Sequence, residues 1–241
     1  MAIISNTVSY LDGDTLLEGF FAFDDAISGR RPVVLINHTW AGRDEFVKEK
    51  AIKLAELGYL GFAVDMYGRG KVGGSVEECS ALMQPFIDDR LTIVKRLQAA
   101  YAAVRLMPWV DDKQIAMIGF CFGGLCALDF ARSGANLKGV VTFHGLLNPP
   151  SDSNPASIVA KLLVLHGHDD PMVPVEQIVA FEQEMTKAAV DWQLHTFSQT
   201  QHAFTNPKAN NPDFGTIYQE NSDRRSWILM KNFFEEIFAS S

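Results

Sequence analysis

The chain has 241 residues, of which 47% are hydrophobic and 21% are charged, and its formal net charge is -8. This length and composition fit one globular α/β domain over residues 1–241, and the acidic balance argues against nucleic acid as a partner. Three cysteines make no disulfide framework, no apolar run approaches membrane-spanning length and the N-terminus lacks signal-peptide features, so we expect a cytoplasmic protein that needs no membrane.

The first half of the chain alternates predicted strands and helices. The turn signal Asp12-Gly13-Asp14 joins two strands, over 7–11 and 17–23, that are expected to pair antiparallel at a sheet edge. The continuous apolar runs predict further strands that are buried on both faces. A weak, glycine-rich pattern over 68–85 is interpreted as a mobile loop near the site. In order, the other predicted elements are a strand over 32–36, a helix over 44–57, a strand over 59–64 and a helix over 87–105.

The second half continues the alternation. The proline- and serine-rich stretch 148–157 predicts a loop, and the stretch after 197 is expected to be a loop that carries His202. The predicted strands are 114–118, 137–143, 161–165 and 192–197, and the predicted helices are 125–132, one around 178–185 and one over 227–238.

Strands that alternate with helices predict a mostly parallel sheet, here of about eight strands, flanked by helices on both faces. No insertion is long enough for a large lid domain. Ligands of such sheets bind outside the carboxyl ends of the strands. The polar residues of interest all follow predicted strands, which places a single site at that edge.

The stretch 117–124, Met-Ile-Gly-Phe-Cys-Phe-Gly-Gly, has the form of a nucleophile elbow with a thiol in place of a hydroxyl. A buried strand precedes it and a helix follows it. Glycines flank Cys121 because side chains at those positions would collide with the strand or the helix. The helix directs its N-terminal amides at Cys121, which favours the thiolate.

A thiol nucleophile needs a base, and the base needs an acid that fixes its tautomer. On this fold the chain order is nucleophile, acid, histidine. After Cys121 the strand-end candidates are Asp169 or Asp170, followed by His202, whereas His195 lies inside a predicted strand and is interpreted as structural. Spacing alone does not decide between the two aspartates, but the rigid segment 171–174 after Asp170 favours it.

Four segments together resemble the dienelactone hydrolase family, whose members are cysteine-dependent hydrolases of the α/β-hydrolase fold. The segments are Gly119-Phe120-Cys121-Phe122-Gly123-Gly124, Asp65-Met66-Tyr67-Gly68-Arg69-Gly70, His166 to Pro174 (HGHDDPMVP) and His202-Ala203-Phe204, in family order from about Pro32 to the C-terminus.

The resemblance implies a catalytic triad of Cys121, Asp170 and His202, with an oxyanion hole made by the backbone amides of Phe122 and Trp40. Two positions depart from the family pattern. Thr39 stands where the type member has a glutamate that keeps the resting thiol protonated, so the Cys121–His202 pair is expected to be activated more persistently. Asn206 stands where that member has an arginine for a substrate carboxylate, which favours a neutral ester or lactone.

The expected reaction is acyl transfer through a thioester on Cys121, without a cofactor. Two alternatives remain open: hydrolysis of phosphotriesters by the same thiol, and a hydrolase fold retained as a non-catalytic small-molecule receptor. The expected partner is a small-molecule substrate, and a homo-oligomer is compatible with the sequence but not inferable from it. The candidate substrate-binding residues are Thr39, Trp40, Phe86, Phe120, Phe143, His144, Met172, Phe204 and Asn206.

The segment His166-x-His168-x-Asp170 also matches part of the H-x-H-x-D-H pattern of binuclear metallohydrolases. The last position of that pattern is Pro171, which cannot ligate a metal. No metal site is therefore predicted.

Overall fold

The computed structural model describes residues 2–151, 153 and 155–239. Two positions of the predicted loop 148–157, 152 and 154, therefore lie outside the described residues. The long strands are β1 (Ile3–Asp12), β2 (Thr15–Asp24), β3 (Arg31–Asn37), β4 (Leu60–Ala63), β5 (Val110–Phe120), β6 (Gly139–Phe143), β7 (Lys161–Gly167) and β8 (Trp192–Phe197).

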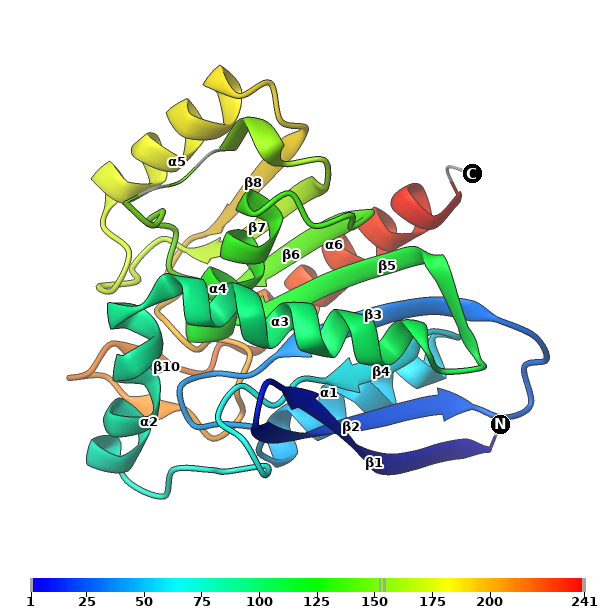
Figure 1. The fold of residues 1–241 in the computed structure, drawn as a ribbon. Coiled ribbons are helices and arrows are strands. Elements are labelled where there is room, and N and C mark those ends of the chain that lie inside the picture. Colours follow the sequence, from blue (N-terminus) through cyan, green and yellow to red (C-terminus); the bar gives the residue numbers. More distant parts are fainter. Residues whose placement is uncertain (1, 152, 154, 240–241) are drawn as a thin grey trace. The chain divides into compact units, whose positions relative to one another are not determined.

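These strands form an eight-stranded sheet with the order β1-β2-β4-β3-β5-β6-β7-β8 (Figure 1). The β1–β2 and β2–β4 pairs are antiparallel, whereas β3–β4, β6–β7 and β7–β8 are parallel. The predicted α/β class and strand number are thus confirmed. Compactness divides the chain into two units between Met117 and Ile118, within β5, and a single domain over 1–241 stays a prediction.

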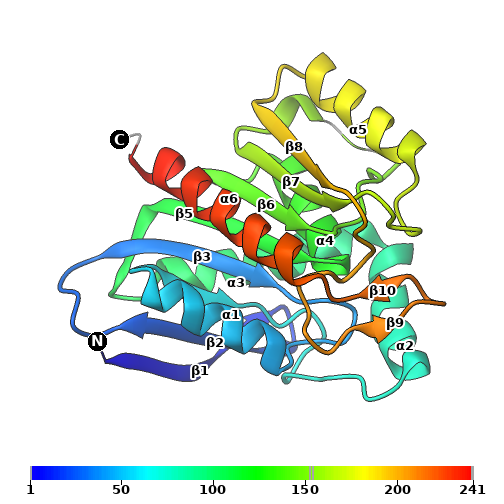
Figure 2. The same ribbon diagram turned by 180° about the vertical axis from the view of Figure 1, so that it is seen from behind.

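In the first unit, helices cover both faces of the strands. The unit contains α1 (Glu45–Glu56), α2 (Val76–Asp88) and α3 (Arg90–Arg105). Helix α1 packs on β2 and β4 and α3 packs on β1, and the two helices lie in front of the strands in opposite views (Figures 1 and 2). The antiparallel hairpin expected at the sheet edge is confirmed, with Leu11 opposite Leu16.

In the second unit, helix α4 (Phe122–Arg132) follows β5 directly and packs on β6. All of its residues are buried, which accounts for its apolar sequence. Helix α6 (Glu220–Ala239) packs on β6 and β7 from the other face (Figure 2). The unit also contains α5 (Val175–Lys187), a 3₁₀ turn over Pro155–Ser157, and the short strands β9 (Asn210–Asn211) and β10 (Thr216–Ile217).

Three sequence-based expectations need correction. The stretch 68–85 is not a loop throughout, because α2 begins at Val76, where the Ser75 hydroxyl accepts a hydrogen bond from Glu78 N at 3.2 Å. The helix expected from residue 87 begins at Arg90, because Asp89 caps it by accepting from Leu91 N at 3.1 Å. The loop after β8 contains the β9–β10 pair.

No helix in the described part of the chain is both long enough and apolar enough to cross a membrane.

Candidate active site

Cys121 lies at a sharp bend between β5 and α4. Its backbone has φ 57° and ψ −121°, in the left-handed half of conformational space that favours glycine. The bend is tight because a Cβ at Gly119 would lie 2.0 Å from Gly123 O, and one at Gly124 would lie 2.4 Å from Thr142 Oγ1. Cys121 N donates to Phe143 O at 3.1 Å, which ties the bend to β6. The predicted elbow geometry is confirmed.

Asp170 and His202 form a buried pair. Asp170 follows β7 and His202 follows β8, and His202 Nδ1 lies 2.7 Å from Asp170 Oδ2. The other oxygen of the carboxylate accepts from Met172 N at 2.9 Å. Asp170 and His202 are 4% and 1% exposed, whereas Asp169 is exposed, so the structure pairs the imidazole with Asp170 rather than with its neighbour.

Cys121 also affects the protonation of His202. Burial lowers the pKa of His202, but the charge of Cys121 and the hydrogen bond that His202 donates to Asp170 outweigh it and raise that pKa to about 10. Cys121 raises this pKa both through its charge and through a side-chain hydrogen bond with His202. The imidazole is thus held in its charged form by two acidic partners.

A small hairpin that the sequence did not predict holds the backbone of His202. His202 N donates to Gly215 O at 2.9 Å, and Ile217 N donates to His202 O at 3.1 Å. Gly215 has φ +74°, and a Cβ there would lie 2.1 Å from Pro171 Cγ. Because Pro171 follows Asp170, Gly215 packs the loop after β7, which carries Asp170, against the loop after β8, which carries His202. An isolated glycine in a polar stretch was the available signal.

The ring of His144 lies against that of His202 within the second unit. The His144 ring lies edge-on, with its centroid 5.0 Å from that of His202 and 5.2 Å from that of Phe204. His144 Nε2 is 2.8 Å from Thr205 Oγ1. Phe120 and Phe143 stack at 4.8 Å and are fully buried, so both are core residues. A contact with substrate stays a prediction for the four predicted pocket residues in this group, Phe120, Phe143, His144 and Phe204.

Met172 lies in the loop after β7 and Asn206 lies in the loop after β8, and both are half-buried. Asn206 Oδ1 accepts from Lys208 N at 3.0 Å, so its side chain stabilises its own turn. A substrate-binding role for Met172 and Asn206 stays a prediction.

The remaining predicted pocket residues lie in the first unit. Thr39 and Trp40 follow β3 and are half-buried, and Trp40 O accepts from the Tyr67 hydroxyl at 2.9 Å. Phe86 is buried at the end of α2, and its ring centroid is 5.6 Å from that of Tyr67. Both rings line a cavity of about 450 Å³ together with Leu82. A substrate-binding role for Thr39, Trp40 and Phe86 stays a prediction.

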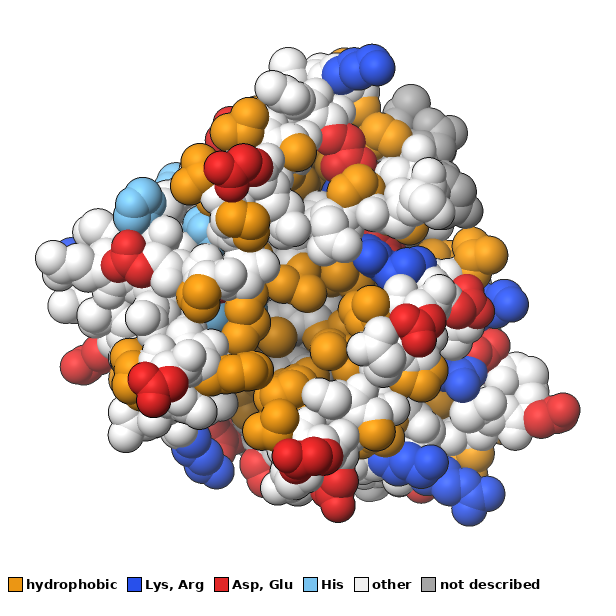
Figure 3. Space-filling model, turned by 90° about the vertical axis from the view of Figure 1, so that its left-hand side faces the viewer, with side chains coloured by type: hydrophobic (Ala, Val, Ile, Leu, Met, Phe, Trp, Pro, Cys, Tyr) orange, Lys and Arg blue, Asp and Glu red, His pale blue; other side chains and the backbone are white. Residues whose placement is uncertain are grey.

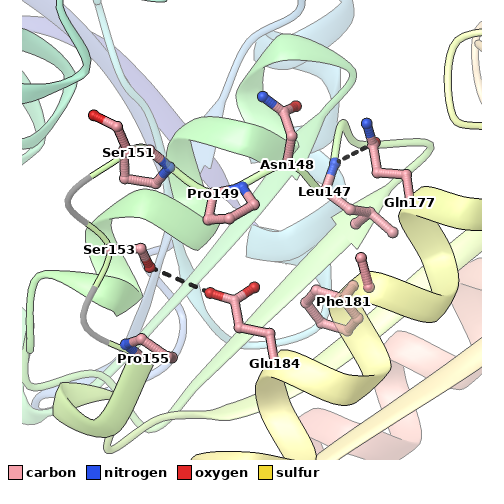
Figure 4. A pocket seen from close by; sticks show the side chains of 11 residues that line it. Leu147, Asn148, Pro149, Ser151, Ser153, Pro155, Gln177, Phe181 and Glu184 are labelled. Carbon is pink, nitrogen blue, oxygen red and sulfur yellow. Dashed lines mark hydrogen bonds between the residues drawn. The ribbon is translucent and has the colours of Figure 1, made fainter.

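A separate cavity of about 410 Å³ lies between the loop after β6 and α5 (Figure 4). Glu184 lies in its wall and accepts from Ser153 Oγ at 3.2 Å and from Arg132 Nη2 at 2.7 Å. Gln177 Oε1 accepts from Leu147 N at 3.1 Å. Cys121, Asp170 and His202 do not line this cavity, so we do not assign the chemistry to it.

Among the described residues, no group of three or more His, Cys, Asp or Glu side chains is arranged to hold a metal ion. Burial lowers the pKa of His166, which is 1% exposed, and His168 is exposed. The two histidines of the partial metallohydrolase pattern therefore lie in different surroundings, because His166 is buried and His168 is exposed.

The model of the dienelactone hydrolase family matches residues 17–238. A solved structure described as a dienelactone hydrolase-like promiscuous phosphotriesterase from metagenomic libraries is 38% identical, with a TM-score of 0.95 over 99% of this chain and 100% of that one. An Aquifex aeolicus protein named "Putative carboxymethylenebutenolidase" is 28% identical over 85% of this chain and 87% of its own. A Bradyrhizobium protein named "Probable 2-oxo-3-(5-oxofuran-2-ylidene)propanoate lactonase" is 27% identical over 74% of this chain and 75% of its own.

Proposed function

Because this chain belongs to the dienelactone hydrolase family and is a hydrolase, we propose that it cleaves neutral carboxylic esters or lactones through Cys121, His202 and Asp170. The observation that carries the proposal is the buried 2.7 Å bond between His202 Nδ1 and Asp170 Oδ2, on an imidazole that Cys121 also perturbs. A nucleophile, a base and an orienting acid are the parts that covalent acyl transfer requires.

The proposed reaction has two stages. The Cys121 thiolate attacks the carbonyl carbon, and the carbonyl oxygen becomes an oxyanion that accepts from the amides of Phe122 and Trp40. The oxyanion then collapses, the C–O bond breaks, and the imidazolium of His202 gives its proton to the leaving alkoxide. In the second stage neutral His202 takes a proton from water, whose hydroxide adds to the thioester. Collapse releases the acid and the Cys121 thiolate, and His202 is again the imidazolium.

One observation supports a neutral substrate: Asn206 brings no charge, and its side chain is bonded to its own turn. Relatives at 28% and 27% identity carry the names of lactone hydrolases, which supports the reaction class; both names describe substrates with a carboxylate, so the neutral preference rests on Asn206. Figure 3 shows hydrophobic side chains and charged side chains of both signs on one face of the molecule. We propose a small, uncharged ester or lactone as the partner, with no cofactor.

Replacement of the nucleophile tests the proposal. Cys121→Ala is expected to abolish turnover of p-nitrophenyl acetate and of a neutral butenolide, measured by absorbance. Cys126→Ala is the matched control, because Cys126 is a buried cysteine five residues further along α4. Intact-mass spectrometry during turnover is expected to show an acyl adduct on the wild-type chain. Equal activity of Cys121→Ala and wild type would exclude the mechanism.

A second activity, hydrolysis of uncharged phosphotriesters, is favoured by the 38% identical structure described as a promiscuous phosphotriesterase. The thiolate would attack phosphorus, the phosphoryl oxygen would accept hydrogen bonds from the same two amides, and p-nitrophenolate would leave. Water would then hydrolyse the S–P bond and restore the thiolate. Release of several equivalents of p-nitrophenol from paraoxon per Cys121 is expected. A single equivalent with a permanent phosphoryl adduct would mean inhibition without turnover.

A further inference from the structure

The loop 38–42, which follows β3, holds the predicted second oxyanion donor, the amide of Trp40. Two other amides of this loop are used inside it: Ala41 N donates to Thr39 Oγ1 at 3.2 Å, and Gly42 N donates to Thr39 O at 3.3 Å. The C=O and N–H of a trans peptide point in opposite directions, so whatever holds Thr39 O also directs the N–H of Trp40. The groups around Thr39 O and Trp40 O therefore set the aim of this donor.

His38 holds the first of these carbonyls. Its Nδ1 lies 2.6 Å from Thr39 O, and its Nε2 accepts from Met66 N at 3.3 Å. An amide can only donate and a carbonyl can only accept, so His38 is the neutral tautomer with its proton on Nδ1. Burial lowers the pKa of His38 to about 4, which keeps the ring in this form at neutral pH. A hydrogen-bond chain thus runs from Met66 N–H through the imidazole to the peptide of Trp40.

Tyr67 holds the second carbonyl. Its hydroxyl donates to Trp40 O at 2.9 Å, and its ring lies edge-on to His38 with centroids 4.7 Å apart. The buried carboxylate of Asp65 fixes the backbone of Tyr67, because it accepts from Tyr67 N at 3.1 Å and from Gly68 N at 2.9 Å. The same carboxylate accepts from Gly70 N at 2.8 Å. Through these contacts the segment Asp65 to Gly70 holds Tyr67 in place to bind the carbonyl of Trp40.

We propose that His38 and Tyr67 are positioning residues that hold the peptides on both sides of Trp40 and so aim its N–H at the oxyanion. This inference rests on the proposed function, because it assigns the segment 65–70 to the oxyanion hole of that reaction. His38 and Tyr67 do not touch the reacting atoms. They act by fixing the φ and ψ of Trp40 before substrate binds, so that no reorganisation is needed in the transition state.

The test separates oxyanion stabilisation from nucleophile activation. Hydrolysis of p-nitrophenyl acetate uses both, whereas alkylation of Cys121 by iodoacetamide forms no oxyanion. Tyr67→Phe is expected to lower the kcat of the ester about 3- to 10-fold and His38→Leu about 10- to 100-fold, with KM within about twofold. Alkylation of Cys121, followed by site-resolved mass spectrometry, is expected to stay within about twofold of wild type.

Two further variants sharpen the result. His38→Asn keeps a donor near the position of Nδ1 and is expected to recover several-fold of the kcat lost in His38→Leu. His195→Gln is the matched histidine control, because its ring lies near the surface, where Nε2 is 3.4 Å from Gln193 Oε1. Unchanged ester kcat in Tyr67→Phe and His38→Leu would overturn the inference, as would an equal loss of alkylation and hydrolysis. A wild-type chain that alkylates but hydrolyses no ester would instead remove the proposed function itself.

Discussion

Asp169 and Asp170 are adjacent carboxylates in very different surroundings. Asp170 is buried and accepts from His202 and from Met172 N, whereas Asp169 is exposed. In Asp170→Asn the side-chain amide would donate to His202 Nδ1, which forces the wrong tautomer on the ring. We expect the kcat/KM for an ester to fall about 10²- to 10⁴-fold. Asp169→Asn is expected to stay within about twofold of wild type, as exposed substitutions usually do.

Asp170→Asn also has a spectroscopic readout. The hydrogen bond that His202 donates to Asp170 is one of the causes that raise the pKa of His202 to about 10, after the charge of Cys121. Loss of the carboxylate is therefore expected to lower that pKa in an NMR titration of the imidazole. If Asp169→Asn reduced activity as much as Asp170→Asn, the orienting role would belong to the acidic loop as a whole. The preference for Asp170 in the sequence came from the rigid segment after it, and the 2.7 Å bond supports that choice.

At the scale of elements, the β9–β10 hairpin ties the two catalytic loops together through Gly215. In Gly215→Ala the new methyl group would meet Pro171 Cγ at 2.1 Å in a backbone with φ +74°. We expect a loss of about 1–3 kcal/mol in the free energy of unfolding. We also expect a loss of about 10- to 100-fold in ester kcat, because the geometry of Asp170 and His202 shifts together.

Gly29→Ala is the control that separates the effect of backbone strain from the effect of the contact with Pro171. Gly29 has φ +83°, and a Cβ there would meet no atom within 4 Å. This variant carries similar backbone strain far in sequence from both loops, so it is expected to lose stability but keep its ester kcat. Urea denaturation and steady-state kinetics measure the two quantities. A comparable loss of kcat in both glycine variants would show that general strain, rather than the contact with Pro171, affects catalysis.

Elements with a strong hydrophobic pattern were predictable, and those without one were not. Strand β8 has the predicted bounds Trp192–Phe197, and its sequence WQLHTF begins with apolar residues that alternate with polar ones. Helix α2 was missed because it buries only Cys79 and Phe86 and contains Pro85, so no apolar stripe marks it. The spacing of Ser75 and Glu78, typical of a capping box, was the signal that could have revealed it. Strands β9 and β10 have two residues each, too few for any period to show.

At the scale of the whole molecule, the candidate residues lie at strand ends, but the roles of many depend on contacts that no motif encodes. Cys121, Asp170 and His202 could be proposed from the sequence because chain order and turn chemistry restrict the candidates. The bond from Tyr67 to Trp40 O joins residues 27 positions apart, and the bond from Met66 N to His38 joins residues 28 apart. Such pairings arise only when β3 and β4 lie side by side, so the fold is needed before they can be inferred.

Buried neutral histidines make the free energy of unfolding of the whole molecule depend on pH. The pKa of His38 falls from 6.5 to about 4 on folding, chiefly through burial, and burial also lowers that of His166. Between pH 6.5 and 4 the unfolded chain therefore binds more protons than the folded chain, so stability falls as the pH falls. The raised pKa of His202 acts on the other side, because its contribution is fully present below pH 6.5 and is lost as the pH rises through about 10.

Urea denaturation of wild type and His38→Asn between pH 8 and 4 isolates one of these histidines. The difference in unfolding free energy between the two chains is expected to change by up to about 3 kcal/mol from pH 6.5 to 4, with wild type losing more. The contribution of His166 and of carboxylates common to both chains cancels in this difference. Parallel curves would show that His38 is protonated as readily in the folded chain as in the unfolded one. In that case the ring would be protonated below about pH 6.5, where Nε2 could no longer accept from Met66 N and the chain of hydrogen bonds to the Trp40 peptide would be broken.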